Sequence, residues 1–219
     1  MKTKGHSPRK LAFILLSMAC VACVATATIT VIHGRSLGIS DLPTAYAQGC
    51  FIYDVNDPQL NSGFADYIFV GRVVKILRTE QEGGLDTLET VYEVDVVKNL
   101  KGELQSTIAF YKGGGITQKG ALKPLGIGRE VVCYAGDFLP LENDVCIFYA
   151  TAQEDGRLTD IGGPNSNILL PEIDLESKGA LEENQLYKDA VLAIENQVVP
   201  ELKIDCYTAN FDASKARPF

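Results

Sequence analysis

The chain has 219 residues, of which 46% are apolar, and a formal net charge of −8. This length allows one domain with a sizeable core and an appendage. The apolar content excludes general disorder, and the acidic balance argues against nucleic-acid binding. The charge is unevenly distributed: residues 48–219 carry 15 basic and 27 acidic side chains, a net charge of −12.

The N-terminal residues have the pattern of an export segment. A basic stretch at residues 2–10 precedes 22 uncharged residues at 11–32. This order is typical of a signal peptide or of an N-terminal membrane anchor. An uncleaved anchor is possible because 22 helical residues span about 33 Å, enough for a bilayer. Both alternatives place the rest of the chain outside the cytoplasm, either secreted or tethered to the membrane through residues 11–32.

Small residues mark where a signal peptide would be cut. Ala45 and Ala47 satisfy the small-residue requirement of signal peptidase, so cleavage is predicted before Gln48. Ala25 and Ala27 form a second, earlier candidate. Cleavage is favoured over retention of the anchor, and both alternatives stay open.

Export changes the meaning of the cysteines. Cys20 and Cys23 belong to the apolar export segment. The other four would meet an oxidising compartment, so two disulfides are predicted, with three possible connectivities. A zinc site is not expected, because these four include no CxxC spacing and no histidine accompanies them. The four are Cys50, Cys133, Cys146 and Cys206.

The absence of histidine limits the chemistry of the exported part. His6 and His33 are the only histidines of the chain, and both precede Gln48. Ser-His-Asp and Cys-His nucleophilic systems are therefore excluded, as are histidine-ligated metal sites. We expect no catalytic residues, no metal and no cofactor.

The exported part has mainly β patterns. Residues 64–78 form a long run that is apolar on both faces, with Gly71 in its middle, which is typical of a bent barrel strand. Residues 90–98 alternate between apolar and polar side chains. Five or six short strands indicate a small antiparallel barrel. Further strands are predicted at 107–111, 130–134, 145–151 and 158–161, with a hairpin turn at Asp155-Gly156.

Two segments without periodicity interrupt these strands, at residues 113–129 and 162–171. The first begins with three glycines, Gly113 to Gly115. We interpret this triplet as a turn or bulge at a strand end, because no Lys-Ser/Thr pair follows it as in a phosphate-binding loop. Both segments are candidate contact loops.

One helix is predicted near the C-terminus. Leu186, Ala190, Ile194 and Val198 recur every four residues, and Pro200 follows them. We expect this stripe to pack on the barrel. The predicted organisation is an export segment at 1–47, a barrel at 48–174, and the helix with a loose tail at 175–219.

Several segments together resemble a known family. Residues 65–73 (ADYIFVGRV) and 92–102 (YEVDVVKNLKG) read like its first two strands, and residues 133–158 read like its later strands. With Cys50 near the mature N-terminus, the chain resembles netrin-like (NTR) modules, the group that includes the tissue inhibitors of metalloproteinases (TIMPs) and many bacterial exported proteins. The resemblance implies a five- to six-stranded antiparallel OB-fold-like barrel.

The resemblance also implies a disulfide pairing. In the family the N-terminal cysteine is bonded to the cysteine before the later strands, which implies Cys50–Cys133 here and leaves Cys146–Cys206. The chain departs from the family at Ile52, where a second cysteine is usual, and at Cys146, where an aliphatic residue is usual. A rival pairing, Cys133–Cys146 with Cys50–Cys206, stays open on geometric grounds.

The leading functional hypothesis is a non-enzymatic, exported or membrane-tethered NTR-like module that binds a protein or a cell-surface component. We expect it to be a monomer. A net charge of −12 favours a basic or neutral partner over nucleic acid or anionic lipid. The family's metalloproteinase inhibitors chelate zinc through the α-amine of an N-terminal cysteine. Inhibition by that route is not expected here, because Gln48 and Gly49 would precede Cys50.

Two other classes of function are weighed beside the binding module. One is a carboxylate- or calcium-dependent enzyme of the cell envelope, for which Asp155, Asp160 and Asn165 form only a weak cluster. The other is a structural envelope spacer without a discrete ligand, which predicts that the barrel has no pocket of useful size.

Overall fold

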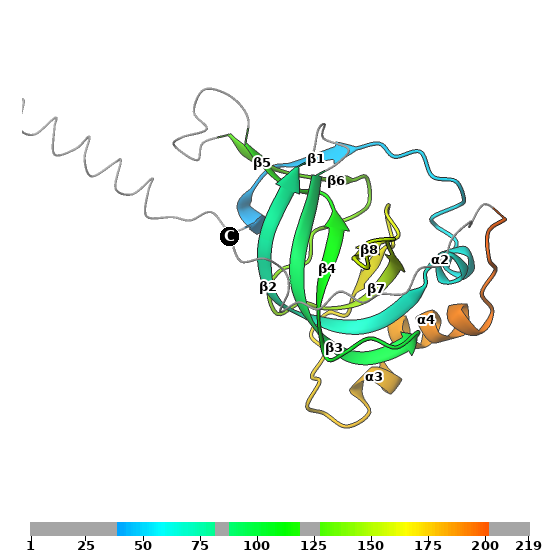
Figure 1. The fold of residues 1–219 in the computed structure, drawn as a ribbon. Helices are drawn as coiled ribbons and strands as arrows, with labels where there is room; N and C mark the ends of the chain where they lie inside the picture. Colours follow the sequence, from blue (N-terminus) through cyan, green and yellow to red (C-terminus); the bar gives the residue numbers. More distant parts are fainter. Residues whose placement is uncertain (1–38, 82–87, 119–127, 202–219) are drawn as a thin grey trace, which may run out of the picture. The chain divides into compact units, whose positions relative to one another are not determined.

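A computed structural model describes residues 39–81, 88–118 and 128–201 (Figure 1). The chain divides into two compact units, residues 1–41 and 42–219. The described part of the first unit is the 3₁₀ helix η1 (Ile39–Asp41). The predicted export helix at 11–32 and the tail with Cys206 lie outside the described residues. Among the described residues, no helix is both long and apolar enough to cross a membrane.

Five strands close into a barrel within the described part of the second unit. β2 pairs with β3, β3 with β4, β4 with β8, β8 with β7, and β7 returns to β2. The β4–β8 contact is parallel and the other four are antiparallel. The prediction of a mainly β fold built on a small barrel is confirmed. The bounds are β2 Tyr67–Gln81, β3 Leu88–Lys101, β4 Thr107–Gly113, β7 Val145–Ala152 and β8 Leu158–Asp160.

The glycine triplet joins the barrel to a second, three-stranded sheet. β4 ends at Gly113 and β5 (Gly115–Gln118) begins two residues later, with Gly114 at a φ of +103° that favours glycine. The predicted turn is confirmed. The prediction that all of 113–129 is loop is wrong, because β5 pairs with β6 (Arg129–Tyr134) and finds its hydrogen bonds there.

The small sheet has the order β1-β6-β5 and lies at one end of the barrel (Figure 1). β1 (Thr44–Ala47) runs parallel to β6, and β5 runs antiparallel to it. Gly114, the residue between β4 and β5, is hydrogen-bonded to β3 of the barrel. The Gly114 N–H donates to the Leu88 carbonyl at 2.7 Å, and Thr90 Oγ1 donates to the Gly114 carbonyl at 2.8 Å.

The barrel interior is filled with aromatic side chains. Phe69 stacks on Phe148 with ring centroids 5.3 Å apart, and Phe110 lies 4.9 Å from Phe148. The inward positions of β3 predicted by alternation, Tyr92 and Val94, belong to this cluster. Aromatic burial of this kind supplies a large share of the hydrophobic stabilisation of a small domain.

The predicted two-sided burial of β2 is also observed. Phe69 and Val73 face the interior, whereas Ile68 and Val70 belong to a second cluster outside the barrel. Four register shifts between β2 and β3 bend the long strand around the barrel. Gly71 lies between two of the shifted pairs and has no side chain to collide with the interior.

The outer cluster is covered by helix α4 (Gln185–Glu195), as the sequence pattern predicted. The buried residues of the helix are Tyr187, Ala190 and Ala193. The predicted stripe is wrong at its ends, because Leu186 is 40% exposed and Val198 lies beyond the helix. The Asn196 side chain donates to the Leu192 carbonyl at 2.8 Å and ends the helix before Pro200.

Besides η1, β1 and β5, three more short elements were not predicted. Helix α2 (Pro58–Phe64) begins at Asp57, whose carboxylate accepts hydrogen bonds from the next turn, and Pro58 occupies its first position. α3 (Ala180–Glu183) is a single turn. β9 (Asn167–Leu169) lies in the segment 162–171, which was expected to be irregular, and pairs with β7.

A substitution at Gly71 tests the bend of β2. A Cβ added there would lie 2.5 Å from the Val94 side chain and 3.0 Å from the Phe69 ring. We expect Gly71→Ala to lower the free energy of unfolding by roughly 1–3 kcal/mol, measured by urea denaturation. Gly113→Ala is the control, because its Cβ would meet nothing closer than 3.6 Å. Equal stability of the two variants would contradict the packing described.

Candidate functional site

Residues 48–50, which follow β1, lie beside the start of β3 and the ends of β4 and β8, a position that we call the barrel mouth. Aromatic contacts hold the chain that follows. Phe51 packs edge-on against Tyr134 with ring centroids 5.5 Å apart, and Tyr53 packs against Phe64 at 4.9 Å. A Cβ at Gly49 or Gly163 would lie 2.7 Å from the Phe51 ring, so both glycines permit the close approach. Cys50 is thereby placed beside the barrel mouth.

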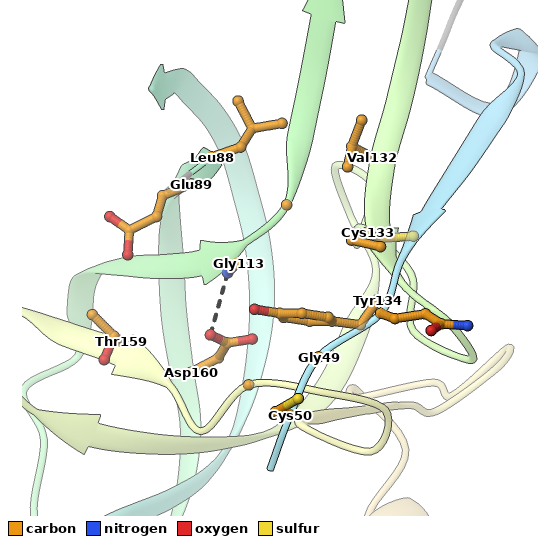
Figure 2. A pocket seen from close by; sticks show the side chains of 14 residues that line it. Gly49, Cys50, Leu88, Glu89, Gly113, Val132, Cys133, Tyr134, Thr159 and Asp160 are labelled. Atoms are coloured by element: carbon orange, nitrogen blue, oxygen red, sulfur yellow. Dashed lines mark hydrogen bonds between the residues drawn. The ribbon is translucent and has the colours of Figure 1, made fainter. Parts of the chain in front are cut away.

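A pocket of about 380 Å³ lies under this segment (Figure 2). Its walls are residues 47–50, the start of β3, the end of β6 and the end of β8. Gly113 and Gly114 border it, as does Gly162. The structure therefore brings the starts of the two candidate contact loops, which are distant in sequence, to one site.

Two carboxylates line the pocket, Glu89 from β3 and Asp160 from β8. Asp160 is fixed, because its Oδ1 accepts a hydrogen bond from the Gly113 N–H at 3.2 Å. The Tyr134 ring extends across the pocket toward Asp160 (Figure 2). Glu89 lies 3.8 Å from the Arg157 guanidinium and is only partly buried. The pocket is therefore lined with acidic groups that a cationic group could contact.

Behind Asp160 lies a lysine that is completely buried. Lys112 follows Ile108 and Phe110 at the two-residue period that points side chains into the barrel. Its Nζ donates to Asp137 Oδ2 at 2.7 Å, to Asp160 Oδ2 at 3.2 Å and to Ser166 Oγ at 3.0 Å. All three donor hydrogens of the ammonium group have acceptors, which is the condition for burying a charge.

The charge of Lys112 is stabilised by its acidic partners. Burial alone would lower the pKa of Lys112, but the Asp160 and Asp137 carboxylates outweigh burial and raise it. The pKa of Asp137 is raised by its own burial, which the contact with Lys112 does not fully offset. One ammonium facing two carboxylates leaves the cluster with an excess negative charge beside the pocket.

The Lys112–Ser166 contact has the composition of a serine–lysine catalytic pair, and its environment argues against that role. A lysine acts as a general base only when it is unprotonated, whereas Asp137 and Asp160 keep Lys112 charged. Ser166 is 0% exposed and its hydroxyl donates to Asp160 Oδ2 at 3.0 Å. A substrate has no access to that hydroxyl, so the cluster has the features of a structural ion network.

Sequence reasoning identified Asp160 only as part of a weak calcium cluster, and the structure does not assemble that cluster. Asp155 pairs with Arg157 at 2.6 Å, and the Asn165 side chain donates to the Val55 carbonyl. Across residues 39–81, 88–118 and 128–201, no group of three or more His, Cys, Asp or Glu side chains is placed to hold a metal ion.

Of the four predicted disulfide cysteines, the three in the described residues carry free thiols. Cys50 is exposed and Cys133 buried, and both line the pocket. The Cys133 thiol donates to the Asp137 carbonyl at 3.4 Å. Cys146 is 0% exposed inside the barrel, and Cys206 lies outside the described residues. The Cys50–Cys133 and Cys146–Cys206 pairing therefore stays a prediction.

The predicted cleavage motif has a defined position in the fold. Ala45 and Ala47 lie in β1, paired with Val132 and Tyr134 of β6, and Gln48 follows directly in the pocket wall. The compact unit begins at Leu42, so it includes six residues, 42–47, that cleavage before Gln48 would remove.

Comparisons with known proteins add no assignment: no protein-family model and no curated protein sequence matches the chain. The resemblance to NTR modules therefore stays a hypothesis that depends on the segments quoted above.

Removing the buried ammonium tests the ion network. We expect Lys112→Met to lower the free energy of unfolding by about 3–5 kcal/mol, because Asp137 and Asp160 would be left buried without their partner. Lys98→Met is the matched control. Lys98 pairs with Glu182 at 2.7 Å, with side chains 40% and 58% exposed, and its loss should cost about 1 kcal/mol or less. Chemical denaturation that finds equal losses would contradict the structural role of Lys112.

Alkylation and peptide mapping test the cysteine assignments. Burial and the Asp137 carboxylate raise the pKa of the Cys133 thiol, and burial raises that of Cys146. In the reduced, folded protein we therefore expect iodoacetamide to modify exposed Cys50 first and the other two only after unfolding.

Peptide mapping of the protein without reduction is the second arm of this test. The predicted pairing gives a peptide that joins Cys50 to Cys133. A peptide joining Cys133 to Cys146 would contradict it, and so would equal alkylation rates for Cys50 and Cys133 in the reduced protein.

Proposed function

We propose that this chain is a non-enzymatic exported module, secreted or tethered to the membrane, that binds a basic group of a protein or cell-surface partner in the pocket at the barrel mouth. The observation that carries the proposal is that two carboxylates, Glu89 and Asp160, line the same pocket of about 380 Å³. That volume lies in the range of ligand sites, and it disfavours a spacer without a discrete ligand.

Charge supports a cationic ligand. The salt bridges that include the pocket carboxylates Glu89 and Asp160 join four carboxylates to two cations. The carboxylates are Glu89, Asp137, Asp155 and Asp160, and the cations are Lys112 and Arg157. They leave a net charge of −2 near the pocket, and residues 48–219 carry −12. Complementary charge accelerates encounter and excludes acidic competitors.

The barrel supports the family hypothesis at the level of architecture. A closed five-stranded barrel in which β4 and β8 run parallel is compatible with an OB-fold-like module. OB-type barrels bind with one face and its adjoining loops, and here the chain just after β4 and just after β8 borders the pocket at Gly114 and Gly162. Because fold alone does not establish activity, the proposal depends on the pocket itself.

The pocket carboxylate Glu89 is the residue to change. We expect the exported protein to bind the pentapeptide Ala-Ala-Lys-Ala-Ala, with shifts of the Glu89, Gly113 and Tyr134 amide resonances. Glu89→Gln should weaken binding roughly tenfold, or about 1.4 kcal/mol. Glu195→Gln is the matched control, because Glu195 is exposed on α4 and does not line the pocket. If binding is absent, or if both variants weaken it equally, the proposal fails.

A further inference from the structure

β1 is held on the edge of β6 mainly through its backbone. The Val131 N–H donates to the Pro43 carbonyl at 2.9 Å, and the Ala135 N–H donates to the Ala47 carbonyl at 3.3 Å. The side chains contribute little, since Tyr46 is 63% exposed. Pairing that depends on main-chain bonds tolerates other sequences in the same place.

The same short strand carries the predicted cleavage motif. Cutting after Ala47 would separate Thr44–Ala47 from the barrel unit, which then begins at Gln48. Leu42 is the one buried residue among the six that cleavage removes from this unit, and the side chains of Thr44–Ala47 are exposed or half-buried. The released segment therefore buries too little apolar surface to stay bound without a covalent link. Their departure would leave the N–H groups of Val131 and Ala135 unpaired at a sheet edge, a ready template for another strand.

The edge of β6 that β1 would vacate borders the acidic pocket, because Val132, Cys133 and Tyr134 of β6 line it. Ala47, the last residue of β1, lines the pocket together with Glu89 and Asp160. A strand that replaces β1 would place its corresponding residue at that wall. Alanine leaves the pocket unfilled, whereas a lysine or arginine side chain could reach the carboxylates from the same backbone position.

We propose that the processed protein binds an extended, basic strand of a partner protein along the β6 edge that β1 vacates. This inference rests on the function proposed above. The strand lies parallel to β6, with a lysine or arginine at the position of Ala47. β1 occupies this edge until cleavage, so export processing and partner binding are coupled. The register is that of the observed pairs, Tyr46 with Cys133 and Ala47 with Tyr134.

The test uses β1 itself as the template of the probe. The probe is a fluorescein-labelled heptapeptide of residues 42–48 carrying Ala47→Lys, and its binding is measured by fluorescence anisotropy. We expect the processed, exported protein to bind it at least tenfold more tightly than the unprocessed full chain does, because β1 blocks the edge in the latter. The peptide without Ala47→Lys should bind more weakly, and hydrogen exchange at the amides of Val131 and Ala135 should slow in the complex.

A second peptide tests the pairing mode. The backbone groups of Ala45 face the same edge as those of Pro43 and Ala47, because alternate residues of a strand face one neighbour. Ala45→Pro removes an N–H from that edge, so the peptide with both substitutions should bind at least tenfold more weakly.

Several results would overturn the inference, and three of them come from the measurements above or from N-terminal sequencing. They are equal binding to processed and unprocessed chain, equal binding of the proline peptide, and N-terminal sequencing that finds residues 44–47 still joined to Gln48 after export. A processed protein that binds the lysine pentapeptide but not the strand peptide would also overturn it, while leaving the proposed function intact. The β6 edge could instead bind a second copy of this chain. A self-associated complex that depends on the same β6 amides would show this, and it would overturn the proposal of a basic partner.

Discussion

The contact between Lys112 and its two carboxylate partners is the constraint on which the barrel mouth depends. Lys112 ends the interior row of β4, Asp137 follows β6 and Asp160 ends β8, so one ammonium group fixes three elements relative to one another. The same contact orients Asp160, whose second oxygen accepts from Gly113 at the pocket border. A site on rigid strands, supported from behind by satisfied polar groups, keeps its geometry without a ligand.

Much of the architecture could be predicted because strand periodicity is local. The alternation through Tyr92 and Val94, the two apolar faces around Gly71 and the Asp155-Gly156 turn each depend on neighbouring residues, and the structure confirms them. Helix α2 was missed although Asp57-Pro58 is a usual start for a helix. It has seven residues, too few for a clear apolar stripe.

The site was harder to predict because it depends on tertiary contacts. The alternation that predicts an inward Ile108 and Phe110 also places Lys112 inside, so a buried partner could have been expected. Nothing in the local pattern indicates that the partners come from Asp137 and Asp160. Likewise, the sequence around Ala45 and Ala47 is read first as a processing motif, and its pairing with β6 depends on an edge formed elsewhere in the chain.

The closing contact of the barrel also sets when the domain can become stable. β2 pairs with β7, for example Tyr67 with Ala150. The barrel therefore cannot close until β7, which lies far along the chain from β2, is available to pair. Pairings between distant parts of a chain form slowly because the loop-closure entropy is lost before the contact is gained. Under the export proposed above, this delay would keep the chain unfolded while it crosses the membrane, and the barrel would close afterwards.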